Sequence, residues 1–280
     1  MRFVMTGHEG LIGSFLLKRL KQRGDRPILL VDKRSGNSIN ELDKFEIKEK
    51  IDLFIHFGAF CKINKTIENP DLAFEDNVLA TYKVLEFCRK NKIPKIIFTS
   101  SSRVLEPEKN PYTASKIYGE ELVKAYSQCY NIEYVIIRPS TVYGPFNDLT
   151  SRLIDIFILN ALKGGEIKIY GDENKTLDFT YVDDFVDGIL LAMNTKNEEF
   201  DISAGEMVNI SKLADMIITL AGNGVKKFYP PEIAQPQEVE LDITKIKKLG
   251  YVPKVFIEDG LKKTFKWYKE NFEEILKTRK

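Results

Sequence analysis

Short apolar runs recur along the first half of the chain, and helical patterns separate most of them. We expect strands at residues 2–6, 27–32, 51–57, 95–99 and 133–137. Because these runs are almost continuously apolar, helices should cover both faces of the sheet that they form, as in parallel sheets. The pattern therefore predicts an α/β protein with a doubly wound parallel sheet, in which ligands bind at the carboxyl ends of the strands.

The rhythm of the pattern changes after about residue 145. We expect a helix over 150–163, a short strand over 166–170 and a further helix that opens at Asp183 and Asp184. These elements alternate less regularly than the strands and helices expected before residue 145. They predict a smaller C-terminal α/β lobe beside the main sheet.

The domain boundaries follow from this change. We expect a dinucleotide-binding domain over residues 1–145 with about 179–202, and a substrate-binding lobe over about 146–178 and 203–280. The lysine- and glutamate-rich segment 258–280 is typical of a solvated amphipathic helix.

Composition excludes several classes of partner. The 280 residues include 42 lysines and arginines against 41 aspartates and glutamates, so the chain has no basic field for nucleic acid or for a membrane surface. No run approaches 18 apolar residues, and the N-terminus enters a strand directly instead of a cleavable leader. We therefore expect a cytoplasmic protein that binds neither nucleic acid nor membranes.

The cysteines and histidines give no sign of a metal site. Cys61, Cys88 and Cys129 are odd in number and widely spaced among apolar residues, which favours free thiols that act as small buried hydrophobes. His8 and His56 are the only histidines, and neither belongs to a cluster with metal-ligand spacing. We expect no metal.

The segment TGHEGLIG, residues 6–13, follows the first apolar run and opens an amphipathic stretch. Glycines let a backbone bend sharply and approach a ligand, and a helix N-terminus directs free N–H groups at a pyrophosphate. This strand, turn and helix predict a dinucleotide site, although an ordinary tight turn would share the pattern. Glu9 fits only if its carboxylate points to solvent, because it would repel a pyrophosphate.

A second strand ends at Asp32, which lies 19 residues after Gly13. A carboxylate near this spacing binds the ribose hydroxyls of the adenosine half, which favours NAD over NADP. The neighbouring Lys33 and Arg34 would tolerate a 2′-phosphate, so NADP stays open.

Tyr112 and Lys116 are four residues apart in a helical pattern, so their side chains should share a face and the lysine should lower the pKa of the tyrosine. Thr99-Ser100-Ser101-Ser102 ends the fourth strand and would lie beside them. A serine and a tyrosine that reach one substrate oxygen suit proton removal coupled to hydride transfer. A polar strand end and a helix-start aromatic are the alternatives.

Eight motifs occur in a fixed order: TGHEGLIG, VDKRSG, HFGA, Asn77, TSSS, YTASK, RPSTVYGP and YGDENKTLDFTYVDD. Together they resemble the extended short-chain dehydrogenase/reductase family, specifically the NAD-dependent epimerase/dehydratase group that acts on nucleotide sugars. The resemblance covers nearly the whole chain. It implies a Rossmann-type domain with NAD bound, and a homodimer formed through the helix that begins at Tyr112 and the helix spanning about 71–90.

The resemblance also implies roles for individual residues. The catalytic triad maps to Ser101, Tyr112 and Lys116. The implied substrate residues are Ser101, Ser102, Arg103 and Thr141. The implied cofactor residues are Gly7, Gly10, Leu11, Ile12, Gly13, Asp32, Lys33, Phe57, Gly58, Ala59, Asn77, Thr99, Tyr112, Lys116 and Pro139.

The chain departs from the family pattern in ways that affect the substrate. Thr141 replaces a common asparagine, and Leu177 and Gln235 stand where relatives often carry arginines for the nucleotide diphosphate. Only 11 residues separate Ser101 from Tyr112, where relatives have a longer loop. Other cations must bind the phosphates, with Arg152, Lys175 and Arg103 as candidates, or the substrate is not a typical nucleotide sugar.

These observations favour an NAD-dependent epimerase that oxidises carbon 4 of a nucleotide sugar transiently and returns hydride to the other face. A decarboxylase or reductase stays open. A dehydratase is disfavoured because Ser101-Ser102 replace its usual Asp-Glu pair. A catalytically idle NAD-binding regulator is the alternative from another class.

Overall fold

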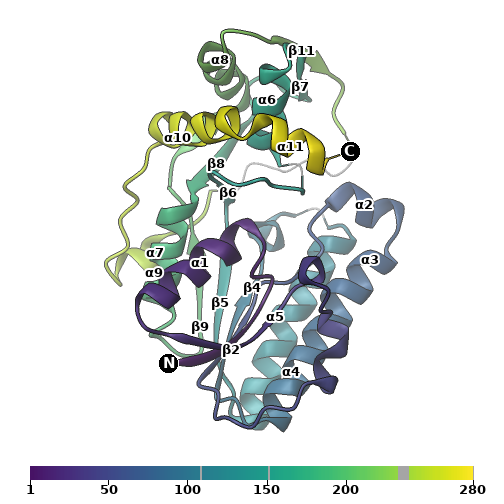
Figure 1. Cartoon of the computed structure of the whole chain (residues 1–280), viewed down its shortest axis with the longest axis vertical. Coiled ribbons are helices and arrows are strands. Elements are labelled where there is room, and N and C mark those ends of the chain that lie inside the picture. The colour runs from purple at the N-terminus through teal and green to yellow at the C-terminus, as the bar shows by residue number, and fades with distance from the viewer. Residues whose placement is uncertain (108, 151, 233–239, 280) are drawn as a thin grey trace.

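The computed structural model describes residues 1–107, 109–150, 152–232 and 240–279. A six-stranded sheet forms its lower half in the view of Figure 1, with the strand order β2-β1-β3-β4-β5-β9, and every neighbouring pair is parallel. The strands are β1 (Arg2–Thr6), β2 (Arg26–Val31), β3 (Leu53–His56), β4 (Lys95–Thr99), β5 (Glu133–Pro139) and β9 (Glu198–Ile202). The doubly wound parallel sheet is confirmed, and the expected strand at 51–57 is shorter than predicted.

Helices cover both faces of this sheet, as the continuous apolar strands predicted (Figure 1). On one face α1 (Leu11–Gln22) and α7 (Val182–Ala192) pack against Phe3 and Met5 of β1. On the other face α4 (Ala80–Lys90) and α5 (Pro111–Tyr130) pack in a second core that includes Val4. Alternate residues of one strand thus enter opposite cores.

The helix α5 begins where the sequence places a strong start signal. The Asn110 side chain accepts a hydrogen bond from the Thr113 backbone N–H at 3.0 Å, and Pro111 occupies the first turn. The expected helix over about 71–90 has three parts, namely α3 (Asp71–Ala73), the π-helical η3 (Phe74–Leu79) and α4. A π-helical stretch interrupts a regular helix and often marks a functional site.

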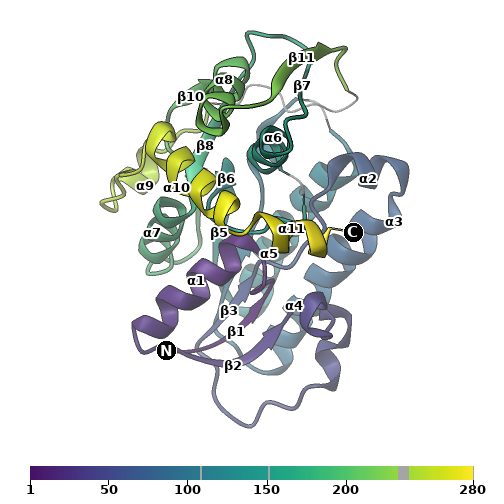
Figure 2. The ribbon, with the colours of Figure 1, turned by 45° about the horizontal axis from the view of Figure 1, so that its top comes forward.

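Apart from β9, α7 and α9 (Thr244–Lys247), the elements after β5 gather above the carboxyl ends of the large sheet (Figures 1 and 2). They form a three-stranded sheet, a two-stranded sheet and helices around a separate core. The strands are β6 (Thr141–Tyr143), β7 (Glu166–Tyr170), β8 (Thr176–Tyr181), β10 (Met207–Asn209) and β11 (Val225–Tyr229). The helices are α6 (Leu153–Leu162), α8 (Ile210–Ala221), α10 (Ile257–Glu270) and α11 (Phe272–Thr278), whereas Ile246 of α9 is buried in the core with α1 and α7.

Two expectations for this half need correction. The helix expected over 150–163 begins only at Leu153. The segment 258–280 is not one solvated helix, because it breaks at Asn271 into α10 and α11, and residues such as Leu261 and Phe265 are buried in the core. Within the described residues, no helix is both long and apolar enough to cross a membrane.

Candidate cofactor site and active site

The glycine turn between β1 and α1 depends on residues that lack a Cβ atom. Gly7 has φ +71°, and a Cβ there would lie 2.6 Å from the backbone nitrogen of Gly58. A Cβ on Gly13 would lie 2.0 Å from the Gly7 carbonyl oxygen. The turn is thus packed backbone against backbone, which brings α1 close to the end of β3.

The N-terminus of α1 suits an anionic ligand. Gly10 is its N-cap and gives no side-chain hydrogen bond to the first-turn N–H groups. Such groups, with the positive end of the helix dipole, bind phosphates. The Glu9 carboxylate is 35% exposed and lies 3.7 Å from the His8 Nε2 atom. The glycine turn therefore fits a dinucleotide pyrophosphate.

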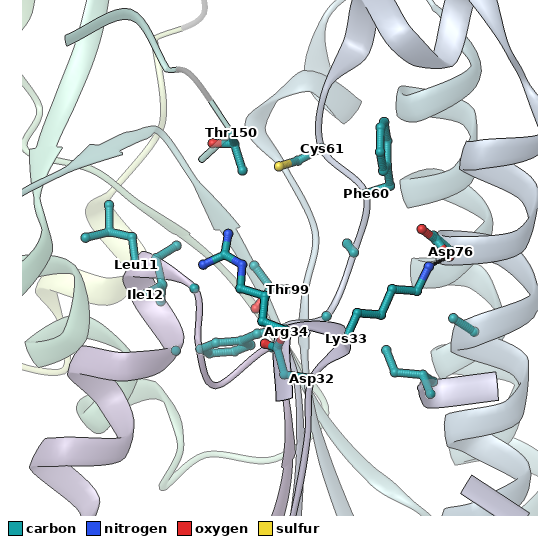
Figure 3. Close-up of a pocket in the computed structure, with 18 of the residues that line it drawn as sticks. Leu11, Ile12, Asp32, Lys33, Arg34, Phe60, Cys61, Asp76, Thr99 and Thr150 are labelled. Carbon is teal, nitrogen blue, oxygen red and sulfur yellow. Dashed lines mark hydrogen bonds and ion pairs between the residues drawn. The ribbon is translucent and has the colours of Figure 1, made fainter. Parts of the chain in front are cut away.

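Asp32, just after β2, is held in place by two backbone groups. Its carboxylate accepts hydrogen bonds from the Glu9 N–H at 3.1 Å and the Arg34 N–H at 3.0 Å. Arg34 also donates to the Glu9 carbonyl oxygen at 2.8 Å, and Lys33 pairs with Asp76 of η3 at 2.5 Å. Figure 3 shows these side chains along one edge of a cleft.

The cleft has a volume of about 320 Å³ and lies at the carboxyl ends of the parallel strands. Two buried hydroxyl oxygens on its wall, from Thr99 and Ser100, lack a hydrogen-bond partner within the described part of the chain, as expected for a ligand site. The expected cofactor residues that line it are Gly7, Gly10, Leu11, Ile12, Gly13, Asp32, Lys33, Phe57, Gly58, Ala59, Thr99, Tyr112, Lys116 and Pro139.

Asn77, the remaining expected cofactor residue, lies buried behind the cleft wall. Its side chain accepts from the Phe60 N–H at 2.8 Å and donates to the Phe60 carbonyl oxygen at 3.0 Å and to the Ser115 hydroxyl at 2.9 Å. Asn77 therefore fixes the backbone of Phe60, which does line the cleft.

Tyr112 and Lys116 share the face of α5 that meets the cleft. Burial, and then the nearby Cys61 thiol, raise the pKa of Tyr112 to about 12 despite a hydrogen bond from Ser101. Burial lowers the pKa of Lys116 to about 8. The expectation that the lysine lowers the pKa of the tyrosine was therefore wrong, because desolvation of the phenol outweighs the neighbouring positive charges.

Ser101 is close to Tyr112, but neither Ser101 nor any other expected substrate residue lines the cleft. The Ser101 hydroxyl bonds with the Tyr112 phenol and also accepts from the Arg103 N–H at 3.2 Å. Arg103 itself pairs with Glu106 at 3.0 Å. Ser102 follows in the same turn of η4 (Ser102–Leu105). Thr141 lines a second cavity of about 20 Å³.

Of the cations considered for a phosphate, Arg152 is the one that the structure brings to the cleft wall. Its Nη1 donates to the Val142 carbonyl oxygen at 3.0 Å, its Nε lies 3.2 Å from the Asp148 carboxylate, and it contacts Cys61 and approaches Tyr112. Leu177 packs against the separate core of the C-terminal elements, and Gln235 lies outside the described residues.

Sequence reasoning missed part of the cleft wall. Phe60, Cys61, Asp76, Asp148 and Thr150 line it, and Figure 3 shows the Cys61 sulfur pointing toward Thr150. The signals that could have found them are the proximity of Phe60 and Cys61 to HFGA, of Asp76 to Asn77, and of Asp148 and Thr150 to RPSTVYGP. The expectation that all three cysteines are buried was wrong, since Cys61 is half-buried and Cys129 is exposed, while Cys88 is buried.

Comparison with known proteins places these features in context. The family model described as the NAD dependent epimerase/dehydratase family matches residues 3–211. A protein of Methanocaldococcus jannaschii, provisionally named a UDP-glucose 4-epimerase, is 33% identical over 96% of this chain and 98% of its own length.

Two further similarities cover as much of the chain. The UDP-N-acetyl-alpha-D-glucosaminuronate decarboxylase of Bacillus cytotoxicus is 29% identical over 96% of this chain and 98% of its own length. The crystal structure of the Thermotoga maritima UDP-glucose 4-epimerase with UDP-glucose superimposes with a TM-score of 0.89 at 26% identity, covering 97% of this chain and all of that one.

Proposed function

The chain belongs to the NAD-dependent epimerase/dehydratase family, and on that premise we propose that it is an epimerase that inverts carbon 4 of a nucleotide sugar. The family contains NAD-dependent nucleotide-sugar epimerases, dehydratases and decarboxylases. The observation that carries the proposal is the buried Tyr112 phenol, bonded to Ser101 and one helical turn from Lys116, in the same cleft as the glycine turn.

Different residues of the cleft would bind the cofactor and act on the substrate. NAD would be held by the first turn of α1 and by Asp32, and Lys116 would bind its nicotinamide ribose. When bound, NAD supplies reversible hydride transfer. Tyr112 would take the proton of the substrate hydroxyl as the general base, and Ser101 would hold the same oxygen in place.

The positive charges of the cleft support this division, whereas burial of the Tyr112 phenol, which raises its pKa, opposes its role as a base. At neutral pH Lys116 keeps its proton, because the lowered pKa of about 8 is still above 7. Arg152 and Arg103 also lower the pKa of Tyr112, against the larger effect of burial. Further positive charge from a bound oxidised cofactor would act in the same direction and favour ionisation of the phenol.

Arg152 would bind an anionic group of the substrate in place of the arginines that are absent at positions 177 and 235. A guanidinium can bind a phosphate or a carboxylate through two parallel hydrogen bonds, which a lysine cannot reproduce. Its closeness to Tyr112 also favours a second candidate function, in which a nucleotide-linked sugar acid is oxidised and decarboxylated in the same cleft.

We further propose that two copies of the chain associate through α4 and α5. Tyr82 on α4 and Tyr118 and Tyr130 on α5 are each more than two-fifths exposed, and exposed aromatic side chains on neighbouring helices are typical of protein–protein interfaces. Light scattering of the purified protein tests this, since a single-chain mass at micromolar concentration would exclude the dimer.

The activity is tested by incubating the purified protein, without added cofactor, with UDP-, GDP- and dTDP-linked sugars and sugar acids. Products are followed by proton NMR, and any dinucleotide released from the protein is identified. A stereoisomeric product with NAD recovered unchanged supports the epimerase. Loss of CO₂ from a sugar acid supports the decarboxylase. Bound NAD with no product from any sugar favours the idle NAD-binding regulator.

A further inference from the structure

Arg279 makes hydrogen bonds through all three nitrogen atoms of its guanidinium group. The Arg279 guanidinium donates to both carboxylate oxygens of Asp155 at 2.8 and 3.0 Å, to the Asn147 side-chain oxygen at 3.1 and 3.2 Å, and to the Asp148 carbonyl oxygen at 2.8 Å. The Asp155 side chain is 4% exposed and the Arg279 side chain 18%. A buried bidentate pair of this kind fixes both position and orientation.

The last two helices, α10 and α11, also contact residues 146–148 and Asp155 through other side chains. The Tyr268 hydroxyl of α10 bonds with Asp155 and donates to the Phe146 carbonyl oxygen at 2.7 Å. The Asn147 side-chain amide donates to the Thr278 hydroxyl at 2.8 Å. Figure 1 shows α11 close to α6, the helix that contains Asp155. Residues 146–148 are therefore attached to the end of the chain.

This segment in turn holds Arg152, one of the cations that line the cleft. The backbone of Asp148 binds Arg279, whereas its carboxylate faces the Arg152 Nε at 3.2 Å and accepts from the Thr150 N–H at 2.9 Å. Asp148, Thr150 and Arg152 all line the cleft. A continuous series of contacts thus runs from Arg279 through Asp148 to Arg152.

We propose that Arg279 is a positioning residue that holds Asp148, and through it Arg152, where Arg152 binds the anionic part of the substrate. The inference rests on the proposed function for its substrate, but the contacts from Arg279 to Asp148 stand without it. Arg279 itself does not line the cleft, so it acts on substrate only through this segment.

The experiment compares Arg279→Gln and Arg279→Lys with the exposed control Lys277→Gln from the same helix. We expect Arg279→Gln to raise KM for the nucleotide sugar about 10-fold, because the loss of one charge-assisted hydrogen bond has an effect of this size. The value of kcat should change less than about threefold. NAD affinity should stay the same, Arg279→Lys should recover part of the loss, and Lys277→Gln should match the parent protein.

A double-mutant cycle distinguishes the positioning of Arg152 by Arg279 from a merely structural role of Arg279. In an Arg152→Met background, Arg279→Gln should raise KM no further, because its effect passes through Arg152. An equal rise in both backgrounds would overturn the proposal. So would a fall in NAD affinity that matches the rise in KM.

Hydrogen exchange gives a readout that does not depend on activity. In Arg279→Gln the amides of residues 147–150 should exchange faster while those of β1 stay protected. If the parent protein converts no sugar but this local change occurs, the proposed function fails and the contact through Asp148 stands. Unchanged exchange at 147–150 overturns the inference whether or not the protein is active.

Discussion

The Lys116 ammonium donates a hydrogen bond to the Thr99 carbonyl oxygen at 2.8 Å, which attaches α5 to the end of β4. The same ammonium lies 5.2 Å from the centre of the Phe98 ring. A Cβ on Gly119, one turn further along, would lie 2.4 Å from that ring, so α5 sits directly on the strand. Tyr112 is thereby fixed beside Ser101 at the carboxyl edge of the sheet.

Removing the Tyr112 hydroxyl tests its role as a general base. Tyr112→Phe should lower turnover by roughly 10²–10⁴-fold, because general acid–base catalysis contributes on that scale. NAD binding and the unfolding temperature should change little. The control is Tyr118→Phe on the exposed part of the same helix. Full activity of Tyr112→Phe in the NMR assay would refute the mechanism.

Arg152 should affect substrate binding more than the chemical step. We expect Arg152→Met to raise KM by about 10–100-fold, since hydrogen bonds to charged groups contribute about 1.5–3 kcal/mol. Arg89→Met, which removes an arginine paired with Glu86 on the surface of α4, is the matched control. Steady-state kinetics that show an unchanged KM for Arg152→Met would remove this residue from the substrate site.

Two glycines with positive φ distinguish backbone strain from steric clash. Gly24→Ala (φ +83°) has nothing within 4 Å of the new Cβ, so it should cost only about 1–2 kcal/mol of stability. Gly7→Ala adds a clash with Gly58 and should also weaken NAD binding markedly. Denaturant unfolding and NAD titration measure both effects. Similar results for the two variants would contradict the tight packing of the turn.

His56 should make stability depend on pH. Its ring nitrogens lie 2.8 Å from the Thr6 hydroxyl and 3.2 Å from the Thr81 hydroxyl, and burial, followed by the Lys116 charge, lowers its pKa from 6.5 to about 3. Between these values the unfolded chain binds a proton that the folded chain does not. The free energy of unfolding should therefore fall as the pH drops from about 6.5 toward 3.

The variant His56→Asn should be less stable than the parent at pH 7, because it disturbs a buried contact. It should also lose less stability than the parent between pH 7 and pH 4.5, because it lacks the imidazole that the unfolded chain protonates. The difference is at most about 1.4 kcal/mol per pH unit for one group. Denaturant unfolding at the two pH values measures this. His8→Asn is the control, and an equal pH dependence in His56→Asn and the parent would show that His56 titrates normally.

Local patterns were enough to predict five of the six strands of the large sheet and the cofactor turn, whereas β9 was not predicted. The apolar runs around Phe3 and Ile96 predicted parallel strands because each side chain enters one of two buried cores. The spacing of Gly7, Gly10 and Gly13 predicted the turn because the positive φ of Gly7 and the close approach of Gly13 to the Gly7 carbonyl are local, whereas the contact of Gly7 with Gly58 is not. The helix expected to begin at Tyr112 begins one residue earlier, at Pro111, where the Asn110 side chain caps it.

Only the tertiary structure decided the chemistry of the cleft. The pKa of Tyr112 follows from its burial, which depends on what α5 packs against and not on the distance to Lys116 along the chain. Arg152 reaches the cleft because Asp148 and Val142 hold it there, and Arg279 meets Asp148 across more than a hundred residues. The sequence by itself determined the elements and the dinucleotide turn, because both arise from short-range geometry. The charges around the reacting group depend on contacts between distant segments, and those exist only in the folded chain.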